Sequence, residues 1–171
     1  FQKNLEMLIK AFEAVAQNNS KVHLFIIGAG EYSPRKDKII QMINKRNLNN
    51  RVTILPWISR KQVQTYIKNA KLYVSSSRYE GMPYSVIESM ALSIPSVLTN
   101  VDGNRDLVID KKSGYLVETG DYVEMANKIL HLLNESRLRD KFGLQANKLF
   151  MQNHLLSNYL QKLTAHYQKY S

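Results

Sequence analysis

Two glutamates separated by seven residues are the side chains of this chain best placed to do chemistry. Glu80 follows an apolar run at 71–74 and a serine patch at 75–77, and Glu88 lies where a helical pattern begins. One carboxylate is therefore expected on a loop after a strand and the other in the first turn of a helix. That is where open α/β sheets bind their ligands. Acceptor carboxylates beside helix-start amides would suit a hydroxyl-rich, phosphate-bearing ligand such as a nucleotide sugar.

Each glutamate also has a purely structural interpretation. A glutamate after a strand is often a surface residue or a turn former. Ser85 and Glu88 have the spacing of a capping box, in which the glutamate returns to the N-cap amide. Gly81 allows close backbone approach and Pro83 stiffens the loop, so the two glutamates together favour a ligand role more than either alone. The amides around Tyr84 and Ser85 are expected to be free donors that suit a diphosphate.

Four further positions are weaker candidates. Gly28 and Gly30 follow an apolar run and could let a ligand approach the backbone closely. No third glycine completes the dinucleotide fingerprint, so a simple tight turn is an equally good interpretation. Trp57 ends a strand, where it could flank a base or serve as a partly buried anchor. Lys3 precedes the first helix and could be a solvated charge. The loop 102–106 reads as a turn with a helix cap, or as a donor contact.

The hydrophobic pattern predicts the elements that position these residues. Short apolar strands alternate with amphipathic helices through the first two thirds of the chain, and the final third is helical. This order predicts an α/β, Rossmann-like parallel sheet with helices on both faces. Strands are expected at 21–27, 52–55, 72–74, 95–98 and 114–117, and helices at 4–18, 35–46, from 59, and at 85–92.

The domain organisation expected is a donor-binding domain over 1–152 and a C-terminal helix over 153–171. Helices are expected from Asp121, around 138–149, and at 156–167. A doubly wound unit normally begins with a strand, whereas this chain opens on a helix. The first strand is therefore expected to be missing, and the chain is expected to be a piece of a longer protein.

Composition narrows the function classes. The chain has 171 residues, no cysteine and four scattered histidines, so no disulfide framework or thiolate metal site is expected. Its net charge of +10 could attract a nucleic acid, an anionic membrane face or phosphorylated substrates, or it could simply keep the protein soluble. Lysine and arginine form no dense block, which disfavours nucleic acid. The chain lacks the Asp-x-Asp pair of metal-dependent transfer, the phosphate loop of P-loop ATP hydrolysis and the nucleophile elbow of ester hydrolysis. The sequence motifs of these three reactions are therefore absent.

The block from Tyr79 to Ala91 resembles the Glu-seven-residues-Glu motif of retaining glycosyltransferases of family 4. Those enzymes have the GT-B architecture, in which two Rossmann-like domains face a cleft. The resemblance covers most of residues 3–135, including the segments 3–12, 24–30, 104–108 and 113–117. It implies that this chain is the C-terminal, donor-binding half.

The resemblance also implies roles for individual residues. Glu80 would meet hydroxyls of the donor sugar and Glu88 the ribose hydroxyls. Lys3 would neutralise the leaving diphosphate; the arginine that family members carry a few residues upstream is not in this chain. The helix-start amides that would meet the diphosphate are those of Met82, Tyr84 and Ser85, and the backbone that would line the base pocket is that of Trp57 and Ile58. Gly28 and Gly81 are further expected donor-binding positions.

A UDP-sugar is the expected donor, although GDP- and ADP-sugars occur in the family, and neither a metal nor another cofactor is expected. The acceptor is expected to be a sugar or lipid-linked sugar held by the missing N-terminal domain. A cytoplasmic location, with peripheral contact at the inner membrane face, would suit polysaccharide or capsule synthesis. The fragment alone is expected to bind nucleotide weakly and not to turn over. A non-catalytic nucleotide-binding or interaction module, or a GT-B sugar-nucleotide epimerase, remains an alternative.

Overall fold

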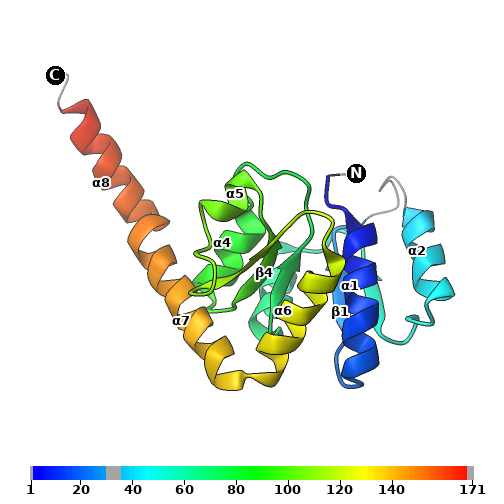
Figure 1. Ribbon diagram of the computed structural model, residues 1–171. Helices are drawn as coiled ribbons and strands as arrows, with labels where there is room; N and C mark the ends of the chain where they lie inside the picture. Colours follow the sequence, from blue (N-terminus) through cyan, green and yellow to red (C-terminus); the bar gives the residue numbers. More distant parts are fainter. Residues whose placement is uncertain (1, 30–35, 169–171) are drawn as a thin grey trace.

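Strands and helices alternate along most of the chain, as the sequence predicts (Figure 1). The computed structural model describes residues 2–29 and 36–168. The first two thirds contain α1 (Leu5–Asn18), β1 (Leu24–Ile27), α2 (Lys36–Lys45), β2 (Val52–Leu55), α3 (Arg60–Asn69), β3 (Tyr73–Ser75), α4 (Tyr84–Ala91), β4 (Ser96–Thr99), α5 (Asp102–Arg105) and β5 (Gly114–Val117).

All strand pairs are parallel, but they form two hydrogen-bonded sheets where the sequence predicted one. β1 pairs with β2, and β4 lies between β3 and β5. Within the described residues β1 and β3 do not pair with each other. In the Rossmann order 3-2-1-4-5-6 the first strand separates the second from the fourth. The observed order fits this arrangement, with β1 and β3 on either side of the position of the first strand, and the expectation that this strand is missing stays a prediction.

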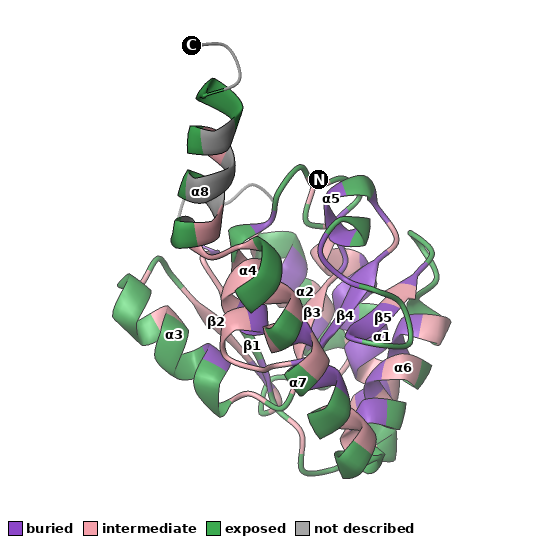
Figure 2. Cartoon of the chain, turned by 90° about the vertical axis from the view of Figure 1, so that its left-hand side faces the viewer, coloured by how far each residue is buried: buried purple, intermediate pink, exposed green. Residues whose placement is uncertain are grey.

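Helices cover both faces of the strands, as predicted. The two central residues of β4 show this, because successive side chains of a strand point to opposite faces. Val97 lies in a core that includes side chains of α1, α2 and α6, and Leu98 lies in a second core with α4 and α7. Both side chains are completely buried. Figure 2 shows buried and half-buried strands between helices whose outer sides are exposed.

The final third is helical, as predicted. It contains α6 (Tyr122–Asn134), α7 (Ser136–Asn153) and α8 (Leu156–Tyr167), and α8 extends away from the rest of the molecule (Figure 1). The Asn147 side-chain amide on α7 donates to the Ala91 carbonyl at 2.8 Å and so satisfies the end of α4. The expected domain boundary after residue 152 falls at the end of α7 and stays a prediction. No helix within the described ranges is both long enough and apolar enough to cross a membrane.

The helix starts confirm one predicted capping box and correct another. At α3, the Gln62 amide donates to Ser59 Oγ at 3.3 Å and the Ser59 amide donates to Gln62 Oε1 at 3.0 Å. The box expected between Ser85 and Glu88 does not form. α4 begins one residue earlier, with Pro83 as N-cap and no side-chain cap. The fixed φ of proline sets that start, and Ser85 is left inside the helix, free to bond elsewhere.

Candidate functional site

Most of the predicted site residues follow the carboxyl ends of strands, and all strand pairs are parallel within each of the two sheets. Gly28 follows β1, Trp57 follows β2, Glu80 follows β3 and Asp102 follows β4. The carboxyl ends of parallel strands share an edge of the sheet. Sequence reasoning placed these residues on separate loops, and the topology brings the loops to the same side of the molecule.

Glu80 and Lys3 form an ion pair that the sequence did not predict. Lys3 Nζ lies 2.6 Å from Glu80 Oε1, although the two residues are 77 positions apart. Ser77 Oγ donates to the same carboxylate oxygen, also at 2.6 Å. The Glu80 side chain is 8% exposed, whereas that of Lys3 is 61% exposed. The carboxylate is therefore held firmly, and the ammonium group still reaches solvent.

Backbone bonds explain why Lys3 meets the Glu80 loop. The Arg78 amide donates to the Gln2 carbonyl at 2.8 Å, and the Gln2 side-chain amide donates to the Tyr79 carbonyl at 3.2 Å. The buried Ser76 hydroxyl lies 3.0 Å from the Lys3 carbonyl and 2.9 Å from that of Asn4. The segment before α1 is therefore joined to the loop after β3. The serine patch was noticed in the sequence as a polar stretch, but its role depends on these distant contacts.

Glu88 stands in a more open environment. Its Oε1 lies 3.3 Å from Arg60 Nε in the first turn of α3. The Glu88 side chain is 22% exposed and that of Arg60 is 80% exposed. No sequence signal pointed to Arg60, because only the packing of α3 beside α4 brings it to Glu88.

A phenol lies within the fields of both glutamates. Tyr73 Oη and Ser85 Oγ are 2.7 Å apart. Burial is the main cause that raises the pKa of Tyr73, the hydrogen bond with Ser85 opposes it, and the charges of Glu80 and Glu88 raise it further. Both carboxylates therefore disfavour ionisation of this phenol.

The start of α4 supplies the predicted anion-binding amides. The amides of Val86 and Ile87 donate to the Pro83 carbonyl at 3.0 and 3.3 Å. The amides of Tyr84 and Ser85 precede them, and no acceptor within the described residues pairs with either. First-turn amides of this kind carry the positive end of the helix dipole, so they suit a phosphate group.

Exposed side chains surround this edge. Trp57 is 84% exposed, so the alternative that it is a partly buried anchor is wrong. Met82 and Tyr84 are also exposed, and Ile58 is half-buried. These side chains are free to meet a ligand, and the base-binding role expected for Trp57 and Ile58 stays a prediction.

Gly28 has a clear backbone reason to be glycine. Its φ is +90°, a conformation that other residues rarely adopt, and its amide donates to the Leu55 carbonyl at 3.1 Å. The turn alternative therefore fits Gly28, and its expected approach to a ligand stays a prediction. Gly30 lies outside the described residues.

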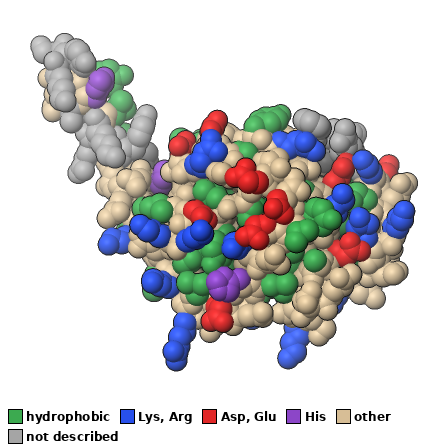
Figure 3. All heavy atoms as spheres, viewed as in Figure 1, with side chains coloured by type: hydrophobic (Ala, Val, Ile, Leu, Met, Phe, Trp, Pro, Cys, Tyr) green, Lys and Arg blue, Asp and Glu red, His purple; other side chains and the backbone are tan. Residues whose placement is uncertain are grey.

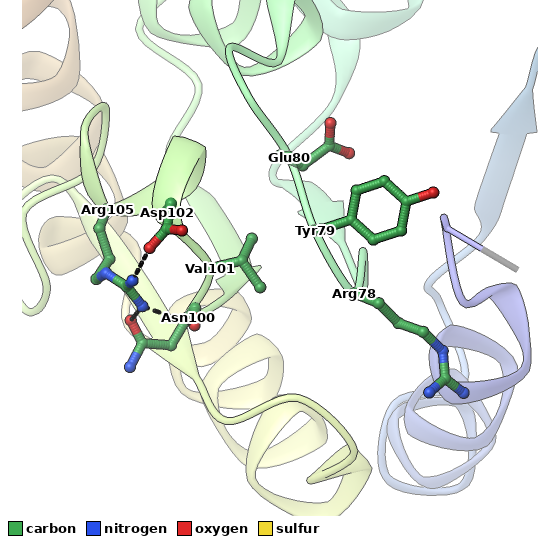
Figure 4. Close-up of a pocket in the computed structure, with 7 residues that line it drawn as sticks. All are labelled: Arg78, Tyr79, Glu80, Asn100, Val101, Asp102 and Arg105. Atoms are coloured by element: carbon green, nitrogen blue, oxygen red, sulfur yellow. Dashed lines mark hydrogen bonds and ion pairs between the residues drawn. The ribbon is translucent and has the colours of Figure 1, made fainter.

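A polar cavity of about 240 Å³ opens beside Glu80 (Figure 4). Asp102 and Asn100 engage the Arg105 guanidinium on one wall, and the side chain of Arg78 extends toward α1. Figure 3 shows acidic and basic side chains interspersed over the face that it displays. Within residues 2–29 and 36–168, no three acidic, histidine or cysteine side chains gather as a metal ion would require. The residues that line the cavity are Arg78, Tyr79, Glu80, Asn100, Val101, Asp102 and Arg105.

Parallel α/β layers with free helix-start amides at the carboxyl edge are the arrangement of nucleotide-binding proteins. Comparison with known proteins identifies the family. The family described as "Glycosyl transferases group 1" matches residues 1–149. This chain therefore belongs to the group 1 family of glycosyl transferases.

Similar proteins come from bacterial surface-polymer synthesis. The chain is 34% identical over 161 residues to the poly(ribitol-phosphate) alpha-N-acetylglucosaminyltransferase of Staphylococcus aureus (strain COL), over 94% of this chain and 32% of that protein. It is 30% identical over 146 residues to the capsular polysaccharide biosynthesis glycosyltransferase CapM of Staphylococcus aureus, over 85% of this chain and 37% of that protein.

A solved structure shows the same fold at similar identity. It is the crystal structure of a S. aureus TarM variant in complex with fondaparinux, alpha-GlcNAc-glycerol and UDP. The TM-score is 0.87 at 32% identity, over 96% of this chain and 33% of that chain. The chain thus spans about a third of the length of the relatives it matches.

Proposed function

We propose that this chain is the donor-binding part of a retaining GT-B glycosyltransferase that uses a UDP-sugar. The observation that carries the proposal is the placement of Glu80, paired with Lys3 at 2.6 Å, on the loop after β3, and of Glu88 in α4, whose first amides are free. A nucleotide sugar has hydroxyls at both ends and a diphosphate between them. The site offers acceptors at two places and anion-binding donors between them.

The proposed chemistry uses charge stabilisation. The bond between the anomeric carbon and the diphosphate oxygen breaks, and the electron pair leaves with the diphosphate. The oxygen of an acceptor hydroxyl bonds to the same carbon on the same face, and its proton passes to the departing diphosphate. The Lys3 ammonium group and the amides of Tyr84 and Ser85 would stabilise that growing charge. Glu80 would hold the sugar through its hydroxyls, with Glu88 on the ribose. We propose that the transfer needs no metal ion.

The proposed acceptor belongs to surface-polymer synthesis at the cytoplasmic side of a membrane. Support comes from the relatives named for poly(ribitol-phosphate) and capsular polysaccharide. A net charge of +10 would favour an anionic acceptor or an anionic membrane face. A second domain would hold the acceptor in this arrangement.

Isothermal calorimetry with UDP, GDP and ADP tests the proposal. UDP is expected to bind, with or without EDTA, and Glu88→Ala is expected to weaken that binding about tenfold, as befits a lost charge-assisted hydrogen bond. Glu135→Ala, which removes an exposed carboxylate between α6 and α7, is the matched control and should leave UDP affinity unchanged. If none of the three nucleotides binds, the proposal is wrong. An EDTA-sensitive affinity would refute its metal-independent part.

A further inference from the structure

The loop that carries Glu80 rests on the first turn of α5. The Gly103 amide donates to the Glu80 carbonyl at 3.0 Å. A Cβ added at Gly103 would lie 2.0 Å from the Gly81 carbonyl oxygen and 2.7 Å from that of Glu80. Real Cβ atoms do not approach backbone oxygen so closely, so any side chain at position 103 must push the loop away.

A chain of buried hydrogen bonds ties α5 to the Glu80 carboxylate as well. Asn104 Nδ2 donates to the Thr99 carbonyl at 2.8 Å, and Thr99 Oγ1 donates to the Ser77 carbonyl at 2.5 Å. Ser77 Oγ then donates to Glu80 Oε1. The side chains of Asn104, Thr99 and Ser77 are fully buried, so water does not compete for these bonds.

These contacts leave one carboxylate oxygen for a ligand. Lys3 and Ser77 both bind Glu80 Oε1, and Oε2 has no partner within the described residues. Asp102 at the start of α5 and Glu80 both line the cavity of Figure 4, so the contact lies directly behind the site. Contacts within the chain, from Lys3 and from the Ser77 network that reaches α5, thus hold the carboxylate.

We propose that Gly103 and Ser77 are positioning residues, which fix Glu80 against α5 and so set how tightly the sugar of the donor is held. The inference rests on the proposed function and extends it to two residues that the family motif of two glutamates does not include. Neither residue touches the nucleotide end of the site, where Glu88, Arg60 and the start of α4 lie. Changes at Gly103 and Ser77 should therefore separate sugar affinity from nucleotide affinity.

The main test compares two glycines at which an added Cβ would meet a backbone oxygen at a similar distance. Gly103→Ala places a Cβ 2.0 Å from a backbone oxygen of the Glu80 loop, and Gly143→Ala on α7 places one 2.1 Å from the Ser93 oxygen, beyond the C-terminal end of α4. Affinities for UDP, UDP-glucose and UDP-N-acetylglucosamine are measured by calorimetry. Gly103→Ala should weaken the sugar nucleotide that binds wild type best by roughly tenfold relative to UDP, because a small misplacement of a binding group is costly. Gly143→Ala should leave that ratio unchanged.

A second pair of variants avoids steric strain. Ser77→Ala removes one hydrogen bond to Glu80 and should lower the sugar-to-UDP affinity ratio about fivefold. Ser96→Ala removes a buried hydroxyl at the start of β4, the end away from Thr99 and Ser77. It should have no effect on the ratio. If both Gly103→Ala and Ser77→Ala bind UDP-sugar and UDP in the wild-type ratio, the positioning inference is overturned and the proposed function stands.

A ligand-free measurement decides the inference even if no nucleotide binds wild type, the result that removes the proposed function. The ¹³Cδ resonance of Glu80 reports on its carboxylate environment. Gly103→Ala and Ser77→Ala should shift it, and Gly143→Ala and Ser96→Ala should not. An unmoved Glu80 resonance in folded Gly103→Ala protein would show that α5 does not set the carboxylate.

Discussion

Glu80 and Glu88 belong to one motif but stand in opposite surroundings. Glu80 is nearly buried, receives two short hydrogen bonds from Lys3 and Ser77, and rests on α5. Glu88 is more exposed, and its ion-pair partner is an arginine that is 80% exposed. The first carboxylate is fixed before any ligand arrives, and the second is held by a contact that solvent can replace.

This difference separates a preorganised end of the site from an adaptable one. A group that acts on reacting atoms gains most from being fixed in advance. A group that only holds a distant part of a ligand can tolerate an exchangeable partner. On the proposed function, the sugar end is preorganised, and the side chains at the nucleotide end, Arg60 and Trp57, are mostly exposed.

The largest expected effect is on stability at the preorganised end. Glu80→Gln should lower the free energy of unfolding by about 1–2 kcal/mol, because it breaks a mostly buried pair whose lysine can still reach water. Glu88→Gln should cost about 0.5 kcal/mol or less. Urea denaturation of both variants checks this, and equal losses would erase the contrast between the two ends.

Tyr73, between the two ends, should make stability depend on alkaline pH. Burial raises the pKa of its phenol above the ordinary 10.0, so the folded state keeps a proton that the unfolded state loses. This contribution is complete below pH 10.0 and is lost as pH rises through the higher folded pKa. Tyr73→Phe should cost about 1 kcal/mol near neutral pH through the lost bond to Ser85.

The cost of Tyr73→Phe should stay constant up to about pH 10 and shrink as the pH rises further, because only wild type loses the phenol's contribution. Burial also raises the pKa of Tyr115, so wild type and variant share that alkaline loss and it cancels in the difference. A cost that is independent of pH would show that folding does not raise the pKa of the Tyr73 phenol.

The capping box of α3 tests whether the adaptable end is independently mobile. Ser59→Ala should destabilise the helix start that carries Arg60 by about 1 kcal/mol. Amide hydrogen exchange should quicken in the first turn of α3 and remain unchanged at Glu80 and Gly81. Faster exchange at both places would mean that the two ends of the site unfold as one unit.

The smallest expected effect concerns Arg60. Arg60→Ala should change the free energy of unfolding by about 0.5 kcal/mol or less, and the difference from wild type should fall as sodium chloride is raised, because salt screens exposed charges. Chemical denaturation by urea at low and high salt measures it. A salt-independent loss well above that size would show that the Arg60–Glu88 pair is structural.

Most of the fold could be predicted because its signals are local. The strands coincide with short apolar runs, and the helices show a 3.6-residue periodicity of apolar residues. Ser59 and Gln62 form the predicted capping box. The Ser85–Glu88 box was wrong because Pro83 begins α4 earlier and Ser85 bonds to Tyr73 across the fold. Trp57 was placed correctly at a strand end, but its exposure depends on which elements surround it.

The sequence by itself determined which residue types stand at the carboxyl edge, because parallel strands and their following loops are encoded by short-range patterns. It placed Glu80, Glu88 and the amides of α4 there. Only the tertiary structure decided the pairing of Lys3 with Glu80, of Arg60 with Glu88, and of Gly103 with the loop behind the carboxylate. The physical reason is that each of these contacts joins residues far apart in the chain, so packing of whole elements creates them and no local pattern can specify them.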